Sequence, residues 1–268
     1  MDESAVDGTH APNPDIRYRW MMRAEARDTV SPGGARAMTS LTVGFPAHNE
    51  AENIGPMIEM ARTKVGPLVD DLEIVVVDDG SSDDTATIVR AMAEDDPRIR
   101  LIEHPVNLGY GAAVRDAIWS ASKELVFFTD SDRQFDLGEI ERFLPRIDGA
   151  DMVIGYRYAR SDPWHRRLFG HGWSWLVNLL FGYVARDVDC AFKLFRRTVI
   201  ETVHVSSGGA MFSAEFLVRA KLAGFRIVEE PVSHYPRLAG SQSGSRPDVI
   251  LRAFRELFRL RWAMWTGQ

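Results

Sequence analysis

Short apolar runs alternate with amphipathic stretches through the first half of the chain. Four such runs occur, at residues 41–46, 72–77, 99–103 and 125–128. All four are predicted strands, and the nearly continuous apolar run at 72–77 is typical of a strand that is covered on both faces of a sheet. Between them, apolar spacing predicts helices at about 50–64, 83–94 and 111–122. This alternation predicts an α/β fold with a Rossmann-like, mostly parallel sheet that helices flank.

After residue 132 the alternation is less regular. The pattern there predicts helices over 137–147, 164–182, 213–223 and 249–265, and strands over 152–155 and 190–195. Gly224 follows the third of these helices and is expected to end it. Residues 1–40 lack sustained periodicity, so we expect a mobile tail there, with a short helix near 19–27. We therefore divide the chain into a tail at 1–40, an α/β domain at 41–245 and a C-terminal amphipathic helix at 246–268.

Composition narrows the class of protein. The chain has 268 residues, of which 45% are hydrophobic and 26% charged, so it can bury one large core. A formal net charge of -6 argues against a general nucleic-acid binder. Cys190 is the only cysteine, which excludes an intramolecular disulfide and fits a reducing compartment. We see no secretory signal, and the stretch 173–184 is too short to cross a bilayer, so we expect a cytoplasmic protein, soluble or peripheral at the inner face of the membrane.

Polar side chains follow three of the predicted strands. The first strand runs into PAHNE at 46–50, the second into DDGSSD at 78–83, and the run at 125–128 into TDSD at 129–132. Ligands of parallel α/β sheets bind beyond the carboxyl ends of the strands. We therefore expect these three segments to meet at one edge of the sheet and to form one site.

Asp130 and Asp132 are the sharpest feature of that edge. A spacing of two places both carboxylates on one side of an extended backbone, where they repel each other unless a cation lies between them. Mg²⁺ or Mn²⁺ prefers such oxygen ligands and keeps positions open for phosphates. The pair is thus a candidate metal site that would neutralise a diphosphate leaving group. The alternative is a solvated turn, because Asp-x-Asp is common by chance.

The acids near the other two strand ends have their own alternatives. Asp78 and Asp79 follow a buried strand directly, and a carboxylate there can accept from a nucleobase or a ribose hydroxyl. Ser82 or Asp83 as a helix cap would explain the later residues of that segment but not the two acids. Glu50 either contacts a ligand or is a first-turn acid favoured by the helix dipole.

These motifs and several later ones share the order and spacing of a known family. The first set is residues 46–50, 78–81, Asn107-Leu108-Gly109 with Gly111, and Asp130-Ser131-Asp132 with Gln134. It resembles the family 2 inverting glycosyltransferases of the GT-A fold. The later half resembles the polyprenyl-phosphate (dolichol-phosphate) sugar synthase branch, through residues 155–157, 166–167, 186–197, 215, 224–232 and 236–237. The resemblance covers residues 41 to about 245, which it identifies as a GT-A glycosyltransferase domain.

The resemblance implies a role for each matched residue. The nucleotide-sugar donor would be held by Pro46, His48, Glu50, and Asp78 or Asp79, and Asp130, Asp132 and Gln134 would hold the cation and the diphosphate. Arg237 would reach toward phosphate, and the acceptor, a polyprenyl phosphate, would meet Arg157, Arg166 and Arg167. His48 replaces the usual Tyr, and Gly170 and Gly244 stand where the branch often has Ser and Lys. The implied activity is transfer of a hexose from a GDP- or UDP-sugar, as in a polyprenyl-phosphate mannose or glucose synthase.

The acceptor decides whether the reaction requires a base. A hydroxyl acceptor requires a carboxylate or His, and Glu215 is the candidate, with a helix-surface acid as the alternative. A phosphate monoester is already anionic near neutral pH, because its second pKa is about 6. It requires cations instead, which the arginines supply unless they form a solvated basic surface.

The C-terminal segment is basic and amphipathic. Residues 246–268 contain five arginines against two acids. Ile250, Phe254, Leu257, Phe258 and Trp265 fall roughly on one face of the expected helix, which suits an anionic membrane surface. The alternative is that this face docks on the catalytic domain. The aromatic helix at 164–182 is a second candidate for membrane contact, and a separate membrane subunit is a further candidate partner.

Three other classes fit the sequence less well. A dinucleotide-dependent oxidoreductase would explain Gly109-Tyr110-Gly111, but Val114 stands where the third glycine belongs and the turn is not in the first βα unit. A sugar-nucleotide pyrophosphorylase would have a basic, Gly-rich loop after the first strand, where this chain has an acidic one. A non-catalytic sugar or lipid binder would not be expected to keep both aspartates and Gln134.

Overall fold

The computed structural model describes residues 39–159, 164–209, 211–238 and 247–266. All of them belong to one compact unit, Met38–Gln268. The expected tail, its short helix near 19–27 and the substitution at Gly244 lie outside the described residues.

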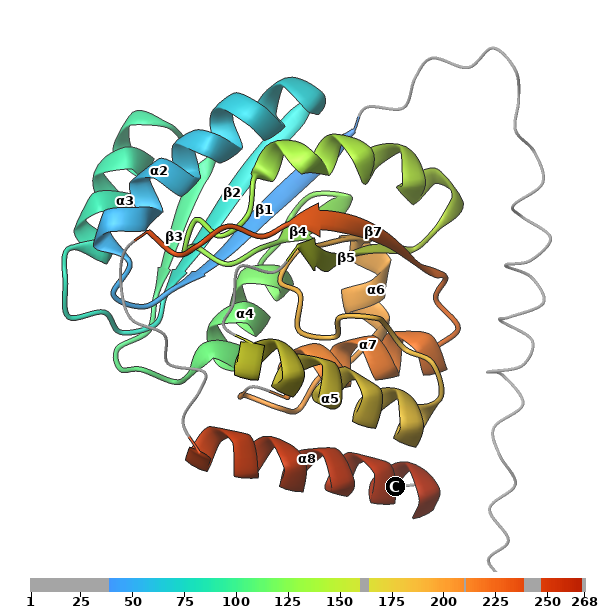
Figure 1. Cartoon of the computed structure of the whole chain (residues 1–268). Helices are drawn as coiled ribbons and strands as arrows, with labels where there is room; N and C mark the ends of the chain where they lie inside the picture. The colour runs from blue at the N-terminus through green and yellow to red at the C-terminus, as the bar shows by residue number, and fades with distance from the viewer. Residues whose placement is uncertain (1–38, 160–163, 210, 239–246, 267–268) are drawn as a thin grey trace, which may run out of the picture. The chain divides into compact units, whose positions relative to one another are not determined.

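A seven-stranded sheet forms the centre of this unit (Figure 1). Its strands are β1 (Ser40–Ala47), β2 (Asp71–Asp78), β3 (Ile99–Glu103), β4 (Leu125–Phe128), β5 (Met152–Ala159), β6 (Lys193–Arg196) and β7 (Ile227–Ser233). Their order is β3-β2-β1-β4-β6-β5-β7. Within this described sheet, β6 runs antiparallel to both neighbours and the other pairs are parallel. The predicted α/β architecture with a mostly parallel sheet is therefore confirmed.

Helices cover both faces of the sheet. Figure 1 shows α2 (Ala51–Met60) and α3 (Thr85–Asp95) on one face, and α4 (Tyr110–Trp119), α6 (Arg197–Thr202) and α7 (Phe212–Leu222) on the other. Two further helices, α5 (Trp164–Phe181) and α8 (Pro247–Thr266), lie farther from the sheet on this second side. The predicted C-terminal helix is thus present as α8. None of the described helices is long and apolar enough to cross a membrane.

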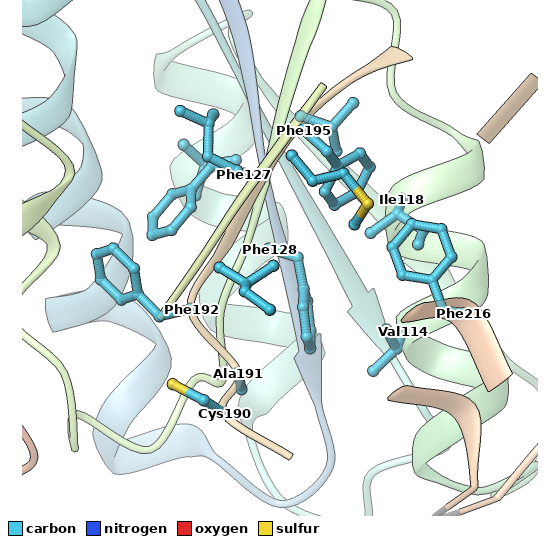
Figure 2. Close-up of a cluster of buried hydrophobic side chains, with 14 of the residues drawn as sticks. Val114, Ile118, Phe127, Phe128, Cys190, Ala191, Phe192, Phe195 and Phe216 are labelled. Atoms are coloured by element: carbon cyan, nitrogen blue, oxygen red, sulfur yellow. The ribbon is translucent and has the colours of Figure 1, made fainter. Parts of the chain in front are cut away.

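Aromatic side chains fill the core on both faces of β4 and β6 (Figure 2). Phe127 and Phe192 meet on one face with ring centroids 4.6 Å apart, and Phe195 and Phe216 meet on the other at 5.2 Å. Strand β4 is therefore buried on both faces, which is the burial that the continuous apolar run at 125–128 predicts.

Two predicted elements differ from the structure. The expected helix at 137–147 is two short 3₁₀ helices, η3 (Leu137–Arg142) and η4 (Leu144–Gly149), and Pro145, which lacks a backbone N–H, opens the second. The expected strand at 190–195 begins only at Lys193. The buried Lys193 side chain donates to the carbonyls of Val188 and Cys190, in the segment before the strand.

Other boundaries follow local chemistry. Gly224 has φ +79°, and the amides of Gly224 and Phe225 donate to the carbonyls of Lys221 and Ala220, so the predicted glycine does end α7. The first helix continues past Met60 as a π turn, η1 (Ala61–Val65), and a 3₁₀ turn, η2 (Gly66–Leu68). Strand β7 was not predicted, because apolar and polar residues do not alternate regularly in its sequence. It contains Pro231, which is tolerated because β7 is an edge strand.

Candidate functional site

The three polar segments meet at the carboxyl end of β1, β2 and β4, as predicted. Ser131 donates a hydrogen bond to the carbonyl of Pro46, which joins the segment after β4 to the end of β1. The amide of Asn49 donates to Ser81 Oγ over 2.8 Å, and the amide of Ser82 donates to Asn49 Oδ1 over 2.8 Å. These bonds hold the loops after β1 and β2 together, so one rigid rim surrounds the candidate site.

Asp130 and Asp132 form the acidic centre of this rim. Burial raises the pKa of the Asp130 carboxyl, although Tyr110 donates to its Oδ1 over 2.8 Å. Burial and the charge of Asp130 together raise the pKa of Asp132 to about 7. Two carboxylates that disfavour each other's ionisation are a donor set that a divalent cation stabilises. The described residues contain no group of three or more His, Cys, Asp or Glu side chains suited to a metal. A cation held by Asp130 and Asp132 would have further positions open for water and substrate phosphate.

Arg237 lies beside both acidic segments. Its Nη2 contacts Glu50 Oε1, and its Nη1 lies 3.6 Å from Asp132 Oδ2. Glu50 also accepts from Asn53 Nδ2 over 2.6 Å. Glu50 is thus more than a first-turn acid, because its carboxylate is turned into the site and pairs with an arginine from the segment after β7.

Gln134 connects the two sides of the site. Its backbone amide donates to Asp132 Oδ1 over 3.1 Å, and its Nε2 donates to the carbonyl of Tyr235 over 3.0 Å. The amide of Tyr235 donates in return to the Gln134 carbonyl over 2.9 Å. Gln134 therefore positions the segment that carries Arg237 against the loop that carries Asp132.

Asp78 and Asp79 have different surroundings. Asp79 accepts from the amides of Leu108 and Gly109 over 2.8 and 2.9 Å, and His104 Nδ1 lies 2.7 Å from its Oδ1. Its carboxylate therefore builds the turn that starts α4. Asp78 accepts from the amide of Ser81 through Oδ2, whereas its buried Oδ1 has no hydrogen-bond partner. Of the two acids, Asp78 is the one with an acceptor to spare for a ligand.

The remaining residues of the first two loops take local roles as well. Asp83 accepts from the amide of Thr85 over 3.0 Å, but the N-cap position of α3 is Asp84, one residue later than the predicted cap. His48 is exposed, and its Nδ1 lies 2.8 Å from the carbonyl of Asp79. A carbonyl can only accept, so Nδ1 carries the proton and Nε2 is left as an acceptor, 3.2 Å from the exposed Asn49 Nδ2.

The predicted acceptor arginines are in different situations. Arg157 makes a two-pronged pair with Asp187, at 2.6 and 2.7 Å, and this pairing keeps its pKa above the usual range against the effect of burial. Arg167 is exposed on α5, and the Arg166 side chain is outside the described part. The charges of Lys193, Arg157 and Arg237 all act on Asp130, so cationic groups from three segments surround the acidic centre.

Glu215 is fully engaged in the protein. Its buried carboxylate accepts from the amides of Ser206 and Ser207, from the Ser206 hydroxyl, and from Arg219 Nε over 2.6 Å. Burial raises the pKa of Glu215, but these bonds outweigh it and lower the pKa below the usual range. The next residue of that loop, Gly208, packs closely on Gly111. A Cβ on residue 111 would lie 2.5 Å from the carbonyl carbon of Gly208. This geometry makes Glu215 a clamp for a loop. The alternative of a helix-surface acid is wrong, because Glu215 is buried, whereas its role as a base stays a prediction.

Sequence reasoning gave no role to four further residues of the site. Tyr110 bonds Asp130, Asp187 pairs with Arg157, and Lys193 is buried near Asp130. Asp189 is exposed at the rim, yet surrounding protein and the charge of Asp187 raise the pKa of its carboxyl to about 6. The only signal for the last three was their place in the run at 186–197.

Known proteins are similar to this chain in sequence and in fold. Residues 42–214 match the profile of Glycosyl transferase family 2. Polyprenol monophosphomannose synthase of Mycolicibacterium smegmatis is 30% identical over 237 residues, which cover 84% of this chain and 88% of that protein. Dolichyl-phosphate beta-glucosyltransferase ALG5C of Trichomonas vaginalis is 32% identical over 71% of this chain and 62% of its own length. Glycosyltransferase AglD of Haloferax volcanii is 30% identical over 75% of this chain, which spans only 34% of that protein.

A solved structure supports the fold. Glucosyl-3-phosphoglycerate synthase of Mycobacterium tuberculosis, crystallised with Mn²⁺, UDP and glucosyl-3-phosphoglycerate, superimposes with a TM-score of 0.62 at 20% identity. The match covers 87% of this chain and 86% of that one. The predicted GT-A fold is confirmed. With a family profile that spans most of the α/β domain, this chain belongs to glycosyl transferase family 2.

Proposed function

We propose that this protein transfers a hexose, with inversion, from a nucleoside diphosphate sugar to a polyprenyl phosphate. The observation that carries the proposal is the acidic pair Asp130 and Asp132, surrounded by cationic groups at the carboxyl end of a parallel sheet. Such a centre suits a reaction in which the departing diphosphate gains negative charge and the attacking phosphate is already negatively charged when it enters the site.

The donor half of the proposal rests on the rim. The spare oxygen of Asp78 and the exposed Nε2 side of His48 are suited to the base or ribose of the nucleotide. Arg237, held by Glu50, is suited to the diphosphate. The relative from Mycobacterium tuberculosis was crystallised with UDP and Mn²⁺, which supports a nucleotide donor and a divalent cation here.

Mg²⁺ or Mn²⁺ would be held by Asp130 and Asp132. When bound, it would neutralise charge on the leaving diphosphate. Other residues of this chain position the two aspartates and supply positive charge. Tyr110 holds one oxygen of Asp130, Gln134 holds Asp132 through its backbone amide, and Arg237 supplies a fixed positive charge beside Asp132.

The acceptor half rests on what the site offers an attacking oxygen. Glu215 is tied into the protein by four hydrogen bonds and its pKa is lowered, so it is a poor proton acceptor. A phosphate acceptor requires no base: its oxygen forms a bond to the anomeric carbon as the bond from that carbon to the diphosphate oxygen breaks. Three relatives of this chain are named for dolichyl, polyprenol or dodecaprenyl phosphate chemistry, which supports a lipid phosphate.

A second candidate, transfer to a hydroxyl acceptor, is favoured by Asp189. Its raised pKa of about 6 is close to the value that suits a general base near neutral pH. In that case Asp189, and not Glu215, would take the proton of the hydroxyl.

The test is transfer of labelled sugar from a panel of GDP- and UDP-sugars, with Mn²⁺, to a short polyprenyl phosphate and to the matching polyprenol. We expect the phosphate to be glycosylated, the polyprenol to be left unchanged, and NMR of the product to show an inverted anomeric centre. Glycosylation of a soluble hydroxyl compound, with neither lipid glycosylated, would overturn the acceptor assignment and favour the second candidate.

A further inference from the structure

Two helices far from the sheet each leave a stripe of large apolar side chains uncovered. On α5 the stripe is Leu168, Trp175 and Leu179, which are 63–66% exposed. On α8 it is Leu251, Phe258, Trp262 and Trp265, which are 54–72% exposed. Within each stripe the residues are three, four or seven positions apart, so they lie along one face of the helix. We call these two sets the α5 stripe and the α8 stripe.

Neither stripe is the face that holds its helix on the domain. Trp173 and Val177 of α5 are buried, and so are Ala253, Leu257 and Leu260 of α8. The sequence interpretation placed Leu257 on one face with Phe258 and Trp265. The structure separates them, because Leu257 docks on the domain while the other two remain exposed. The α8 helix therefore has one apolar face that docks on the domain and a second one that stays exposed in the described part of the chain.

The two helices are neighbours. Trp173 and Phe254 meet edge to face with ring centroids 5.5 Å apart, and Figure 1 shows α8 beside α5 on the side away from the sheet. Trp262 and Trp265 of the α8 stripe also contact each other, at 5.5 Å. The two stripes therefore lie on neighbouring helices.

The charge around the α8 stripe identifies the partner. Arg252, Arg255, Arg259 and Arg261 are all exposed, and Glu256 is the one acid between residues 251 and 266. At 100° per residue, Arg255 and Arg259 flank the stripe on one side and Arg261 flanks it on the other. This local positive charge contrasts with the net charge of -6 of the whole chain. Tryptophan and arginine in this arrangement suit the interface of an anionic bilayer, where rings enter the headgroup layer and guanidinium groups bind lipid phosphates.

We propose that the α5 and α8 stripes dock the protein on an anionic membrane surface. A second copy of the chain fits less well, because a two-fold contact would bring the same arginines of both copies together. The inference deepens the proposed function, since a polyprenyl phosphate acceptor lies in a bilayer. The docking inference rests on other residues than the proposed function, however, so either one can fail without the other.

The test uses the full chain and vesicles of phosphatidylcholine with and without phosphatidylglycerol. We expect co-sedimentation with the anionic vesicles only. Trp262→Ser with Trp265→Ser, and separately Arg255→Glu with Arg259→Glu, should each lower the partition coefficient about tenfold or more. Arg90→Glu, a charge reversal on α3 at the other face of the sheet, is the matched control and should leave binding unchanged. Quenching of tryptophan fluorescence by brominated lipid should occur in the unchanged protein and fall in the double tryptophan variant.

Sugar transfer to a short polyprenyl phosphate in detergent separates this inference from the proposed function. All of these variants should keep that activity, which also shows that they are folded. Transfer without any vesicle binding would overturn the docking proposal alone, and vesicle binding without transfer would overturn the proposed function alone. Vesicle binding that the stripe variants leave intact, or a dimer that they convert to a monomer without vesicle binding, would also overturn the docking proposal.

Discussion

Arg237 links Glu50 to Asp132, two carboxylates that follow different strands. Its guanidinium contacts Glu50 and lies 3.6 Å from Asp132 Oδ2. One arginine thus neutralises part of the charge that the candidate cation site carries and joins it to the segment after β1.

Asp132→Asn should remove the response to a cation and stabilise the protein without one. The pKa of Asp132 is raised from 3.8 to about 7, so ionising it in the folded chain costs stability. This cost grows as the pH rises from about 4 and is complete above about 7. At pH 8 without metal, the variant should therefore melt at a higher temperature than the unchanged protein, and Mn²⁺ should shift only the latter. Asp148→Asn, an exposed acid in η4, is the control. If Mn²⁺ raised the melting temperature of Asp132→Asn as much as that of the unchanged protein, the metal assignment would be contradicted.

Arg237→Lys should reduce turnover by about 10²-fold, because a lysine cannot contact two separate carboxylates and a diphosphate with one planar group. Glu50→Gln should reduce it less, since the amide can still accept from Arg237. Steady-state kinetics with a saturating donor would measure both. Equal activity of Arg237→Lys and the unchanged protein would show that Arg237 is not used in the reaction.

Glu215→Gln should keep turnover within about tenfold of the unchanged protein, because the amide oxygen can still accept from the Ser206–Ser207 loop. Glu215→Ala should lower the free energy of unfolding by about 2–3 kcal/mol, since it leaves buried donors without a partner. Urea denaturation and transfer kinetics separate the two effects. A loss of turnover by three orders of magnitude in a stably folded Glu215→Gln would restore Glu215 as the base.

Asp78→Ala and Asp79→Ala should differ in kind. Asp78→Ala should raise the KM for the donor about tenfold with little change in kcat, because the lost contact is to the non-reacting nucleotide half. Asp79→Ala should lower thermal stability as well, because three groups of the turn before α4 lose their acceptor. Matched changes in KM, kcat and melting temperature for both variants would refute this division of roles.

His104 should make the turn before α4 sensitive to pH. Burial lowers its pKa, but the adjacent carboxylates of Asp79 and Asp116, at 2.7 and 3.0 Å, outweigh burial and raise it above 6.5. A raised histidine pKa adds stability that is fully present below the unfolded value and is lost as the pH rises through the folded value. The melting temperature of the unchanged protein should therefore exceed that of His104→Gln most at acidic pH, and the gap should narrow as pH rises. A constant gap across the titration would exclude a charged His104.

Local sequence pattern was sufficient for strands β1 to β4, the main helices and the meeting of three loops. Runs such as 72–77 and 125–128 are buried on both sides, and parallel strands necessarily end at the same edge, so the sequence alone places Asp78 and Asp130 together. The glycine that ends α7 was equally predictable, because a positive φ strongly favours that residue.

Tertiary contacts decided how each polar group of the site is used. Asp79 and Glu215 look like free acids in the sequence, yet amides brought from residues 108–109 and 206–207 consume their acceptors. Arg157 is adjacent to no acid in sequence but pairs with Asp187, thirty positions later. The α8 helix likewise has two apolar faces, and the folded domain covers only the one that carries Ala253, Leu257 and Leu260. Hydrogen-bond partners and burial depend on segments distant in sequence, and hydrophobic periodicity carries no information about them.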